Sequence, residues 1–207
     1  MTPWKRAMDL AGGLIALALL WPLMLGVALV IRLRDGAPVL HVSERMHSPQ
    51  RAFALVKFRT MAPDPADRGV SGGDKAARIT PTGAVLRRYR LDEMPQVWNV
   101  LRGDMSLVGP RPPLRRYVEA HPELYAEVLA CRPGLTGLAS IEFHAREAAL
   151  LARCRTAEET ERVYTRRCIP AKARLDLVYR RRRSLGLDLL LLGRTFRRLL
   201  PGAVRRS

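Results

Sequence analysis

Residues 91–112 read LDEMPQVWNVLRGDMSLVGPRP, and two adjacent acids, Asp92 and Glu93, stand near the start of this stretch. Pro95 follows them, and proline is best tolerated in the first turn of a helix, where the backbone N–H has no partner to lose. Apolar residues then recur with helical spacing, and Gly103 is placed to terminate the helix. The pattern predicts a helix that starts at Asp92 and ends just before Gly103, with both carboxylates at its N-terminus.

Positive charge surrounds these two carboxylates. Arg87, Arg88 and Arg90 lie upstream, and Arg111 follows in the GPRP turn. A helix N-terminus also attracts anions, so the stretch is typical of a phosphate site. Two carboxylates would repel a phosphate unless they bind a metal such as Mg²⁺ or one of them attacks the phosphorus. The alternative is that the acids only cap the helix, and their spacing does not decide between the two.

Composition narrows the class of protein. The chain has 207 residues, of which 48% are hydrophobic, so it suits one folded domain with an appended segment. Its formal charge of +17 indicates a polyanionic neighbour: nucleic acid, anionic lipid or a phosphorylated substrate. A basic membrane-anchored protein that binds nucleic acid or lipid without catalysis is one hypothesis. Only 6% of residues are aromatic and no nucleic-acid motif is present, so we expect no nucleic-acid partner.

Cysteine and histidine usage is uninformative about metals. The three cysteines form no CxxC pair, which favours a reducing, cytoplasmic setting. The four histidines lack the spacing of metal ligands, so we expect no transition-metal site.

The N-terminal region contains a long uncharged segment. Residues 10–31 carry no charged side chain, and 22 residues in a helix are enough to cross a bilayer. Basic residues flank the segment on both sides, and Pro22 interrupts it. Symmetric flanks and a mid-segment proline favour a re-entrant helix over a straight spanning helix, and no clear cleavage site supports a signal peptide.

The region after this segment predicts a small β-hairpin. Residues 39–42 and 54–59 read as its two strands, and Lys57 and Arg59 share one face of the second. Both are candidates for phosphate contact; the alternative is a solvated strand face. Residues 62–78 predict a loop that could order on ligand binding, and residues 84–89 a helix that carries Arg87 and Arg88 towards the dyad.

The C-terminal half predicts mainly helices, over residues 115–130, 145–167 and 172–184. Between them, the glycines and proline of residues 132–137 allow a tight turn whose backbone approaches a ligand closely. Residues 185–200 mix leucines with arginines. This pattern suits a helix in the membrane interface, although a helix packed on the domain would give it too.

The chain resembles the bacterial sugar transferase family, the monotopic phosphoglycosyl transferases that act on polyprenyl phosphate. The family carries Asp-Glu, then Asn-Val-Leu-(Lys/Arg)-Gly-Asp-Met-Ser, then Val-Gly-Pro-Arg-Pro, and these blocks match residues 92–93, 99–106 and 108–112. Three further blocks match: Lys-Arg-x-x-Asp at residues 5–9, Lys-Phe-(Lys/Arg)-Thr-Met at 57–61 and Arg-Pro-Gly-(Ile/Leu)-Thr-Gly at 132–137. The match is to the short form that consists of the catalytic domain.

The resemblance implies a mainly helical α+β fold with a re-entrant membrane helix over residues 1–34. It implies a cytoplasmic catalytic domain over 35–207, with a small β-hairpin, catalytic helices and an interfacial amphipathic helix at about 185–200. Relatives break the membrane helix at Ser-Pro, whereas Trp21 precedes Pro22 here, so a serine hydroxyl is missing at the bend.

The resemblance also implies an activity: transfer of a sugar-1-phosphate from a UDP-sugar to undecaprenyl phosphate with release of UMP, at the cytoplasmic face of the bacterial inner membrane. This is the first membrane step of glycoconjugate synthesis, such as that of exopolysaccharide, O-antigen or a glycoprotein glycan. Neither the sugar nor the oligomeric state, a homodimer included, is readable from the sequence.

Roles for individual residues follow from the family pattern. Asp92 would be the nucleophile that holds a covalent phosphosugar, and Glu93 would help to bind Mg²⁺. Phosphate contacts are expected from Lys57, Arg59, Arg87 and Arg111, and nucleotide contacts from Arg132, His144 and Arg146. His144 and Arg146 lie near the place where many relatives carry a nucleotide-binding arginine, and neither matches it directly.

Overall fold

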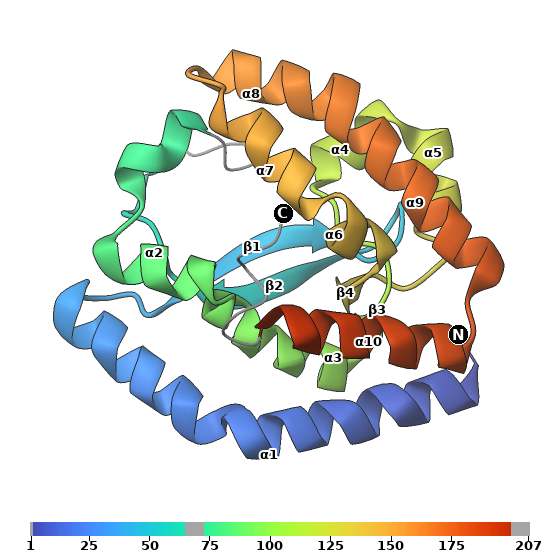
Figure 1. The fold of residues 1–207 in the computed structure, drawn as a ribbon, viewed down its shortest axis with the longest axis horizontal. Coiled ribbons are helices and arrows are strands. Elements are labelled where there is room, and N and C mark those ends of the chain that lie inside the picture. The colour runs from blue at the N-terminus through green and yellow to red at the C-terminus, as the bar shows by residue number, and fades with distance from the viewer. Residues whose placement is uncertain (1, 65–72, 200–207) are drawn as a thin grey trace.

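The computed structural model of the chain describes residues 2–64 and 73–199, and helices dominate it (Figure 1). The helices are α1 Pro3–Arg34, η1 Gly73–Arg78, α2 Pro81–Arg88, η2 Leu91–Gln96, α3 Val97–Arg102, α4 Arg115–Ala120, α5 Pro122–Val128, α6 Leu138–Glu142, α7 His144–Ala152, α8 Ala157–Val163, η3 Tyr164–Cys168, α9 Ile169–Arg182 and α10 Leu185–Leu199. The strands are β1 Leu40–Met46, β2 Ala52–Phe58, β3 Ser106–Val108 and β4 Gly134–Thr136. The predicted α+β, mainly helical class is confirmed.

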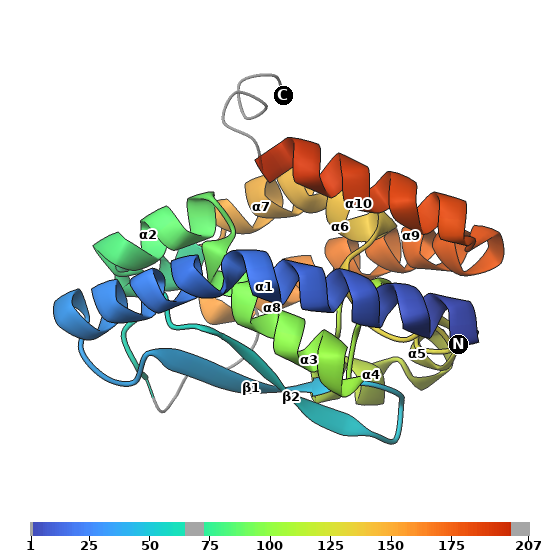
Figure 2. The ribbon, with the colours of Figure 1, turned by 90° about the horizontal axis from the view of Figure 1, so that it is seen from below.

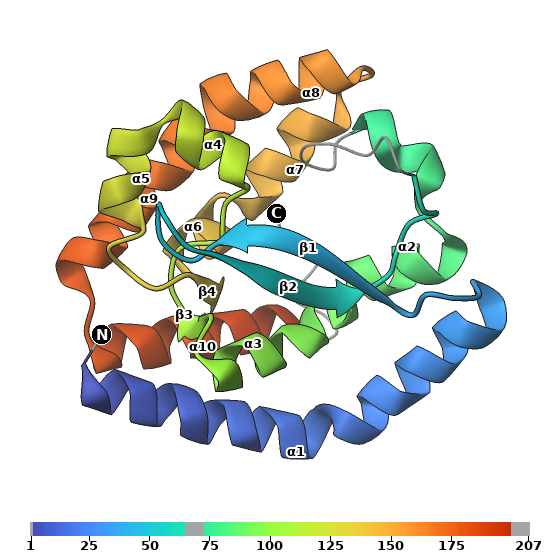
Figure 3. The same ribbon diagram turned by 180° about the vertical axis from the view of Figure 1, so that it is seen from behind.

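β1 and β2 form the predicted antiparallel hairpin, which crosses the middle of the molecule (Figures 1 and 3). His41 pairs with Lys57, and Arg45 pairs with Phe53. The first strand continues to Met46, four residues beyond its predicted end. Of its added residues, Ser43 and Arg45 line a cavity and Glu44 is exposed, so apolar alternation did not reveal them. In the loop predicted after the hairpin, residues 65–72 lie outside the described chain, and the last part forms η1.

The helix predicted after Asp92 is divided in two. Residues of η2 form a 3₁₀ turn, and α3 begins only at Val97. Pro95 explains the division, since it has no N–H for an α-helical bond and the tighter 3₁₀ turn does without it. Gly103 terminates α3 with φ of 88°, as predicted. Arg90, immediately before η2, has φ of 54°, so the chain turns sharply as it enters the acidic pair.

The glycines of residues 132–137 have a role that the sequence did not predict. β4 pairs in parallel with β3, so this block lies beside the GPRP turn. A Cβ at Gly134 would lie 2.1 Å from the nitrogen of Gly109, and one at Gly137 would lie 2.1 Å from its carbonyl oxygen. The close approach is therefore to the backbone of another motif, where we had expected a ligand.

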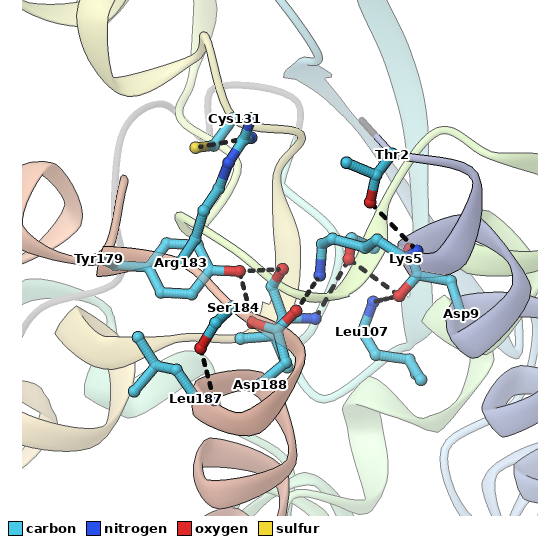
Figure 4. Close-up of polar contacts among 12 residues, drawn as sticks. Thr2, Lys5, Asp9, Leu107, Cys131, Tyr179, Arg183, Ser184, Leu187 and Asp188 are labelled. Carbon is cyan, nitrogen blue, oxygen red and sulfur yellow. Dashed lines mark hydrogen bonds and ion pairs between the residues drawn. The ribbon is translucent and has the colours of Figure 1, made fainter. Parts of the chain in front are cut away.

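Both ends of α1 are attached to the rest of the molecule, and the helix bends around it (Figures 1 and 3). At the N-terminal end Arg6 donates to the carbonyls of Val100 and Leu101. Asp9 accepts from the hydroxyl of Ser106 and, as Figure 4 shows, from the backbone N–H of Leu107. At the C-terminal end Ile31 is fully buried among residues of β2, α2 and η2. The hydroxyls of Thr80 and Thr82 also donate to Asp35, directly after the helix.

The outer face of α1 is apolar and exposed. Leu19 is 73% exposed and Leu33 is 75% exposed. Within the described residues, α1 is the one helix long and apolar enough to cross a membrane, with a mean hydropathy of 2.7 over its most apolar window and 11% of that window buried. Pro22 lies inside a continuous helix, so the break predicted there is a bend.

α10 runs beside the N-terminal half of α1 (Figures 1 and 2). Its Asp188 is 1% exposed, accepts from Lys5 at 2.7 Å and accepts from the hydroxyl of Tyr179 at 2.7 Å (Figure 4). Away from this contact, α10 exposes Leu189 and Phe196. The helix therefore packs on the domain and still presents an apolar face. The two interpretations of residues 185–200, a helix in the membrane interface and a helix packed on the domain, are thus compatible.

Candidate active site

A cavity of about 1090 Å³ is lined by the hairpin, η2, the GPRP turn, α7 and α9. Seven of the residues predicted for the site line it together: Lys57, Arg59, Arg87, Asp92, Glu93, Arg111 and His144. They come from five separate stretches of sequence. The fold therefore brings the two acids and the predicted phosphate-binding cations into one chamber.

Glu93 is held by two arginines. Its Oε1 accepts from Arg111 at 2.6 Å, and its Oε2 accepts from Arg90 at 3.4 Å. Burial alone would raise the pKa of Glu93, but the charges of Arg111 and Arg90 outweigh it and lower the pKa to about 2. Glu93 is therefore ionised at neutral pH and fixed in position.

Asp92 has a different environment. It is buried, and it lies in the first turn of η2 beside Glu93. Burial and then the charge of Glu93 raise the pKa of Asp92, while the cations Lys57, Arg87 and Arg111 act against this. No described residue hydrogen-bonds its carboxylate. Of the two acids, Asp92 is the one whose oxygens are available to a ligand.

Lys57 lines the same cavity from β2, the strand that packs against η2. Burial, followed by the charges of Arg45 and Arg87, lowers the pKa of Lys57 to about 8, and Asp92 partly offsets this. A lysine in such a setting gains most from an anion, because an added phosphate cancels the repulsion of its neighbours.

Arg87 is oriented by a hydrogen bond from its Nε to the hydroxyl of Thr60 at 2.9 Å. α2 delivers it, and α2 packs tightly against the segment after β2: a Cβ at Gly83 would lie 2.1 Å from the carbonyl oxygen of Thr60. Arg88, its neighbour on the helix, does not line the cavity, as the 100° step between residues requires.

Arg59 is held by backbone carbonyls. Its guanidinium donates to the backbone carbonyls of Asp35, Gly36 and Ala37 at 2.6–3.0 Å, and only 7% of the residue is exposed. It therefore fastens the turn after α1 to the hairpin. Arg59 also lines the cavity, and its Nη1 and Nη2 donate to these carbonyls while its Nε has no partner among the described residues, so the phosphate contact predicted for Arg59 stays a prediction.

The three nucleotide-binding candidates are separated. His144 lines the cavity, and burial together with the charge of Arg90 lowers its pKa. Arg146 does not line it and lies over the ring of Phe143. Arg132 is also outside the cavity: its guanidinium lies near Gly103, on the side of α3 that faces α1. Among the three, the geometry supports a ligand contact for His144 only.

The sequence reasoning missed several residues that line the cavity. They are Arg45 on β1, Tyr164 on η3, and Lys172 and Asp176 one turn apart on α9. Lys172 donates to Glu147 at 2.9 Å and to the hydroxyl of Tyr164 at 3.3 Å. Burial raises the pKa of Asp176 to about 7, and Lys172 opposes the shift. Arg45 could have been found from strand alternation, since His41, Ser43 and Arg45 are alternate residues and all line the cavity.

The side chains of the cavity fit a Mg²⁺ site only if a bound substrate supplies further ligands. Among the described residues no group of three metal-binding side chains occurs. Mg²⁺ is commonly held by one or two carboxylates together with substrate phosphates and water. Asp92 has no hydrogen-bond partner among the described residues, and the Oε2 of Glu93 keeps a lone pair beside its long contact to Arg90. These two carboxylates would suit such a shared site.

The chain is similar in sequence to several known proteins. The chain is 35% identical over 204 residues to a UDP-N-acetylgalactosamine-undecaprenyl-phosphate N-acetylgalactosaminephosphotransferase of Aeromonas hydrophila, which covers 96% of this chain and 44% of that protein. It is 43% identical over 148 residues to the exopolysaccharide production protein PSS of Rhizobium leguminosarum, covering 66% of this chain and 72% of that protein. A UDP-glucose:undecaprenyl-phosphate glucose-1-phosphate transferase of Caulobacter vibrioides is 41% identical over 145 residues, covering 66% of this chain and 53% of that protein.

The chain thus spans less than half the length of the Aeromonas protein. The model of the bacterial sugar transferase family matches residues 1–202, which include the acidic pair, its arginines, α1 and α10. This chain belongs to the bacterial sugar transferase family.

Proposed function

We propose that the chain transfers a sugar-1-phosphate from a UDP-sugar to undecaprenyl phosphate and releases UMP. The observation that carries the proposal is the placement of Asp92: a buried carboxylate with no hydrogen-bond partner among described residues, facing a cavity lined by Lys57, Arg87 and Arg111. The printed names of the Aeromonas and Caulobacter relatives describe this reaction class with two different sugars.

The reaction would run in two displacements at one phosphorus. In the first, an Oδ of Asp92 bonds to the sugar-bearing phosphorus, and the bond from that phosphorus to the bridging oxygen breaks, so UMP departs with the electron pair. In the second, a phosphate oxygen of the lipid attacks the same phosphorus, and Asp92 leaves as a carboxylate. No proton needs to be removed from the nucleophile, which suits a carboxylate that is ionised when it attacks.

The cations have separate tasks in this scheme. Lys57 and Arg87 lie near Asp92 and would hold the non-bridging oxygens of the reacting phosphate. Arg111 is paired with Glu93 and would share its remaining donors with the substrate. Glu93 would hold Mg²⁺ together with the donor diphosphate, and the ion would neutralise the charge of that diphosphate. Chelation with EDTA is therefore expected to stop UMP release.

The attachment of α1 supports a re-entrant topology. Both ends of the helix contact the same domain, so both ends would lie on one side of the bilayer, and the exposed apolar face at its bend would enter the lipid. The site would then sit at headgroup depth, where the lipid phosphate is. We propose the cytoplasmic face of the inner membrane, because basic residues flank both ends of α1.

The test is to detect the covalent adduct. Purified protein is mixed with UDP-sugar alone, quenched and examined by intact-mass spectrometry for the added phosphosugar, with UMP measured in parallel. We expect one adduct on the wild-type chain and none on Asp92→Asn. Glu123→Gln is the matched control, because Glu123 is an exposed acid in the first turn of α5. An adduct on Asp92→Asn, or lipid product formed by that variant at the wild-type rate, would refute the role of Asp92.

A further inference from the structure

Arg45 differs from the other arginines of the cavity. Arg87 donates to a threonine, Arg111 to a glutamate and Arg59 to three carbonyls. Arg45 lines the cavity from β1, and among the described residues nothing accepts a hydrogen bond from it; its Nε is buried without a partner. A buried guanidinium N–H without a hydrogen-bond partner is unfavourable. Arg45 is therefore a cation in the cavity wall that has no hydrogen-bond partner in the described part of the chain.

The surroundings of Arg45 increase this cost. Burial and then the charge of Arg111 lower the pKa of Arg45 to about 10, and Glu93 partly offsets them, so Arg45 remains charged at neutral pH. Arg45 in turn lowers the pKa of Lys57. A cluster of cations in which one member forms no hydrogen bond or ion pair with a described residue is typical of a site that an anion completes.

The position of Arg45 along the hairpin indicates which anion. Lys57 pairs with His41 across the hairpin, and Arg45 lies four residues further along β1, which is about 13 Å of strand. Arg45 therefore lines the cavity at a different level of the hairpin from Lys57. In an in-line displacement the leaving oxygen lies on the far side of the phosphorus from the attacking atom, and negative charge develops there.

We propose that Arg45 binds the nucleotide-side phosphate of the donor diphosphate and stabilises the charge on the departing nucleoside monophosphate. This inference rests on the proposed function and assigns a second phosphate subsite in the same cavity. Lys57 and Arg87 would hold the phosphate that is attacked, and Arg45 would hold the one that leaves. The lipid phosphate, which enters after the nucleotide has gone, is the other phosphate that the site must accept.

Half-reactions separate these two phosphates. Full-length protein in detergent is mixed with UDP-sugar in the absence of lipid, and UMP release is followed through one turnover. In a second assay kcat/KM for undecaprenyl phosphate is measured at saturating donor. Arg45→Gln is expected to slow UMP release by about 10- to 100-fold, the effect of losing a hydrogen bond to a charged group, and to leave kcat/KM for the lipid unchanged. Arg45→Lys should restore part of the rate, because it keeps the charge without the bidentate geometry.

Arg115→Gln is the matched control. Arg115 pairs with Glu44 of the hairpin on the exposed surface, and it does not line the cavity. Both rates of Arg115→Gln should equal those of the wild type. UMP release by Arg45→Gln at the wild-type rate would overturn the inference while leaving the proposed function intact. A loss confined to kcat/KM for the lipid would overturn the assignment to the nucleotide side. Absence of UMP release by the wild type with every UDP-sugar tested would instead refute the proposed function.

Thermal unfolding separates binding from a structural role. Because Arg45 forms no hydrogen bond in the described chain, its replacement removes an unfavourable burial, and the Tm of Arg45→Gln and Arg45→Met should equal or exceed that of the wild type. A Tm well below that of Arg115→Gln would mean that Arg45 supports the fold, and it would overturn the inference.

Discussion

Removing the carboxylate of Asp188 should detach α10 from the start of α1. Asp188 is 1% exposed and accepts from Lys5 at 2.7 Å and from Tyr179 at 2.7 Å, as Figure 4 shows. In Asp188→Ala the Lys5 ammonium loses its counter-ion, and the Tyr179 hydroxyl keeps only the carbonyl of Val108, at 3.2 Å. Breaking one side of a buried ion pair costs about 3–5 kcal/mol. For a chain of this size, each kcal/mol lowers Tm by about 2–4 °C, so a fall of about 6–20 °C is expected.

Tryptophan fluorescence during heating can measure this change, because Trp4 stands next to Lys5 in α1. Glu127→Ala is the control: Glu127 pairs with Arg180 at 3.1 Å, but both side chains are at least 40% exposed. An exposed pair contributes about 0–1 kcal/mol, so the control should move Tm little. If Asp188→Ala lowers Tm no more than Glu127→Ala does, the buried pair does not hold the two helices together, and the reasoning fails.

A double variant tests the same pair independently. Lys5→Met with Asp188→Leu removes both charges and fills the space with apolar side chains. Such replacements of a buried pair are often neutral or stabilising, so the double variant should be more stable than Asp188→Ala. Equal losses in the two proteins would indicate that packing around α10, and not the unpaired charge, sets the cost.

Three further predictions follow from single residues. Asp176 has a pKa of about 7 in the folded chain and near 3.8 in the unfolded chain, so between these pH values the folded chain binds one more proton. The free energy of unfolding therefore falls as pH rises from about 4 to 7. Asp176→Asn should raise Tm at pH 8 and not at pH 4, and an equal gain at both pH values would contradict this. Gly83→Ala should destabilise the fold by several kcal/mol and reduce UMP release, since its Cβ would lie 2.1 Å from the Thr60 carbonyl; an unchanged Tm would show that α2 can shift. Lys57 must be protonated to bind phosphate, and its pKa is about 8, so kcat/KM for the donor should fall above about pH 8. Lys57→Arg should move this fall to higher pH. If the pH profile does not move, the fall is due to another group.

Several features of the site were readable because local rules fix them. The acidic pair before a proline predicted a helical turn that begins with carboxylates, and Gly103 predicted where the helix ends. Pro95 also favours a 3₁₀ first turn, because it has no N–H for an α-helical bond, but we predicted one continuous α-helix from Asp92. The hairpin was predicted from its second strand, whose Phe53, Leu55 and Phe58 are buried.

Other features have no local signature, because they depend on contacts between residues far apart in the chain. Lys57 and Arg59 are two positions apart and both line the cavity, yet Arg59 also donates to the backbone carbonyls after α1. The conformation of the segment after α1 decides that difference. Arg132 belongs to a motif that packs against Gly109, so its glycines serve the pairing of β3 with β4, and no spacing rule reveals such a partner.

The sequence by itself determined that the chain is mainly helical, that it begins with an apolar helix, and that two acids start a turn among arginines. These follow from side-chain periodicity and backbone preference, which act over a few residues. Only the tertiary structure decided which arginines line the cavity with Asp92, that Arg45 has no hydrogen-bond partner among residues 2–64 and 73–199, and that both ends of α1 meet one domain. The physical reason is that a charge acts on the groups around it in space, whatever their positions in the sequence. Packing brings together segments that are far apart in the chain, as for Lys5 and Asp188, which are 183 positions apart.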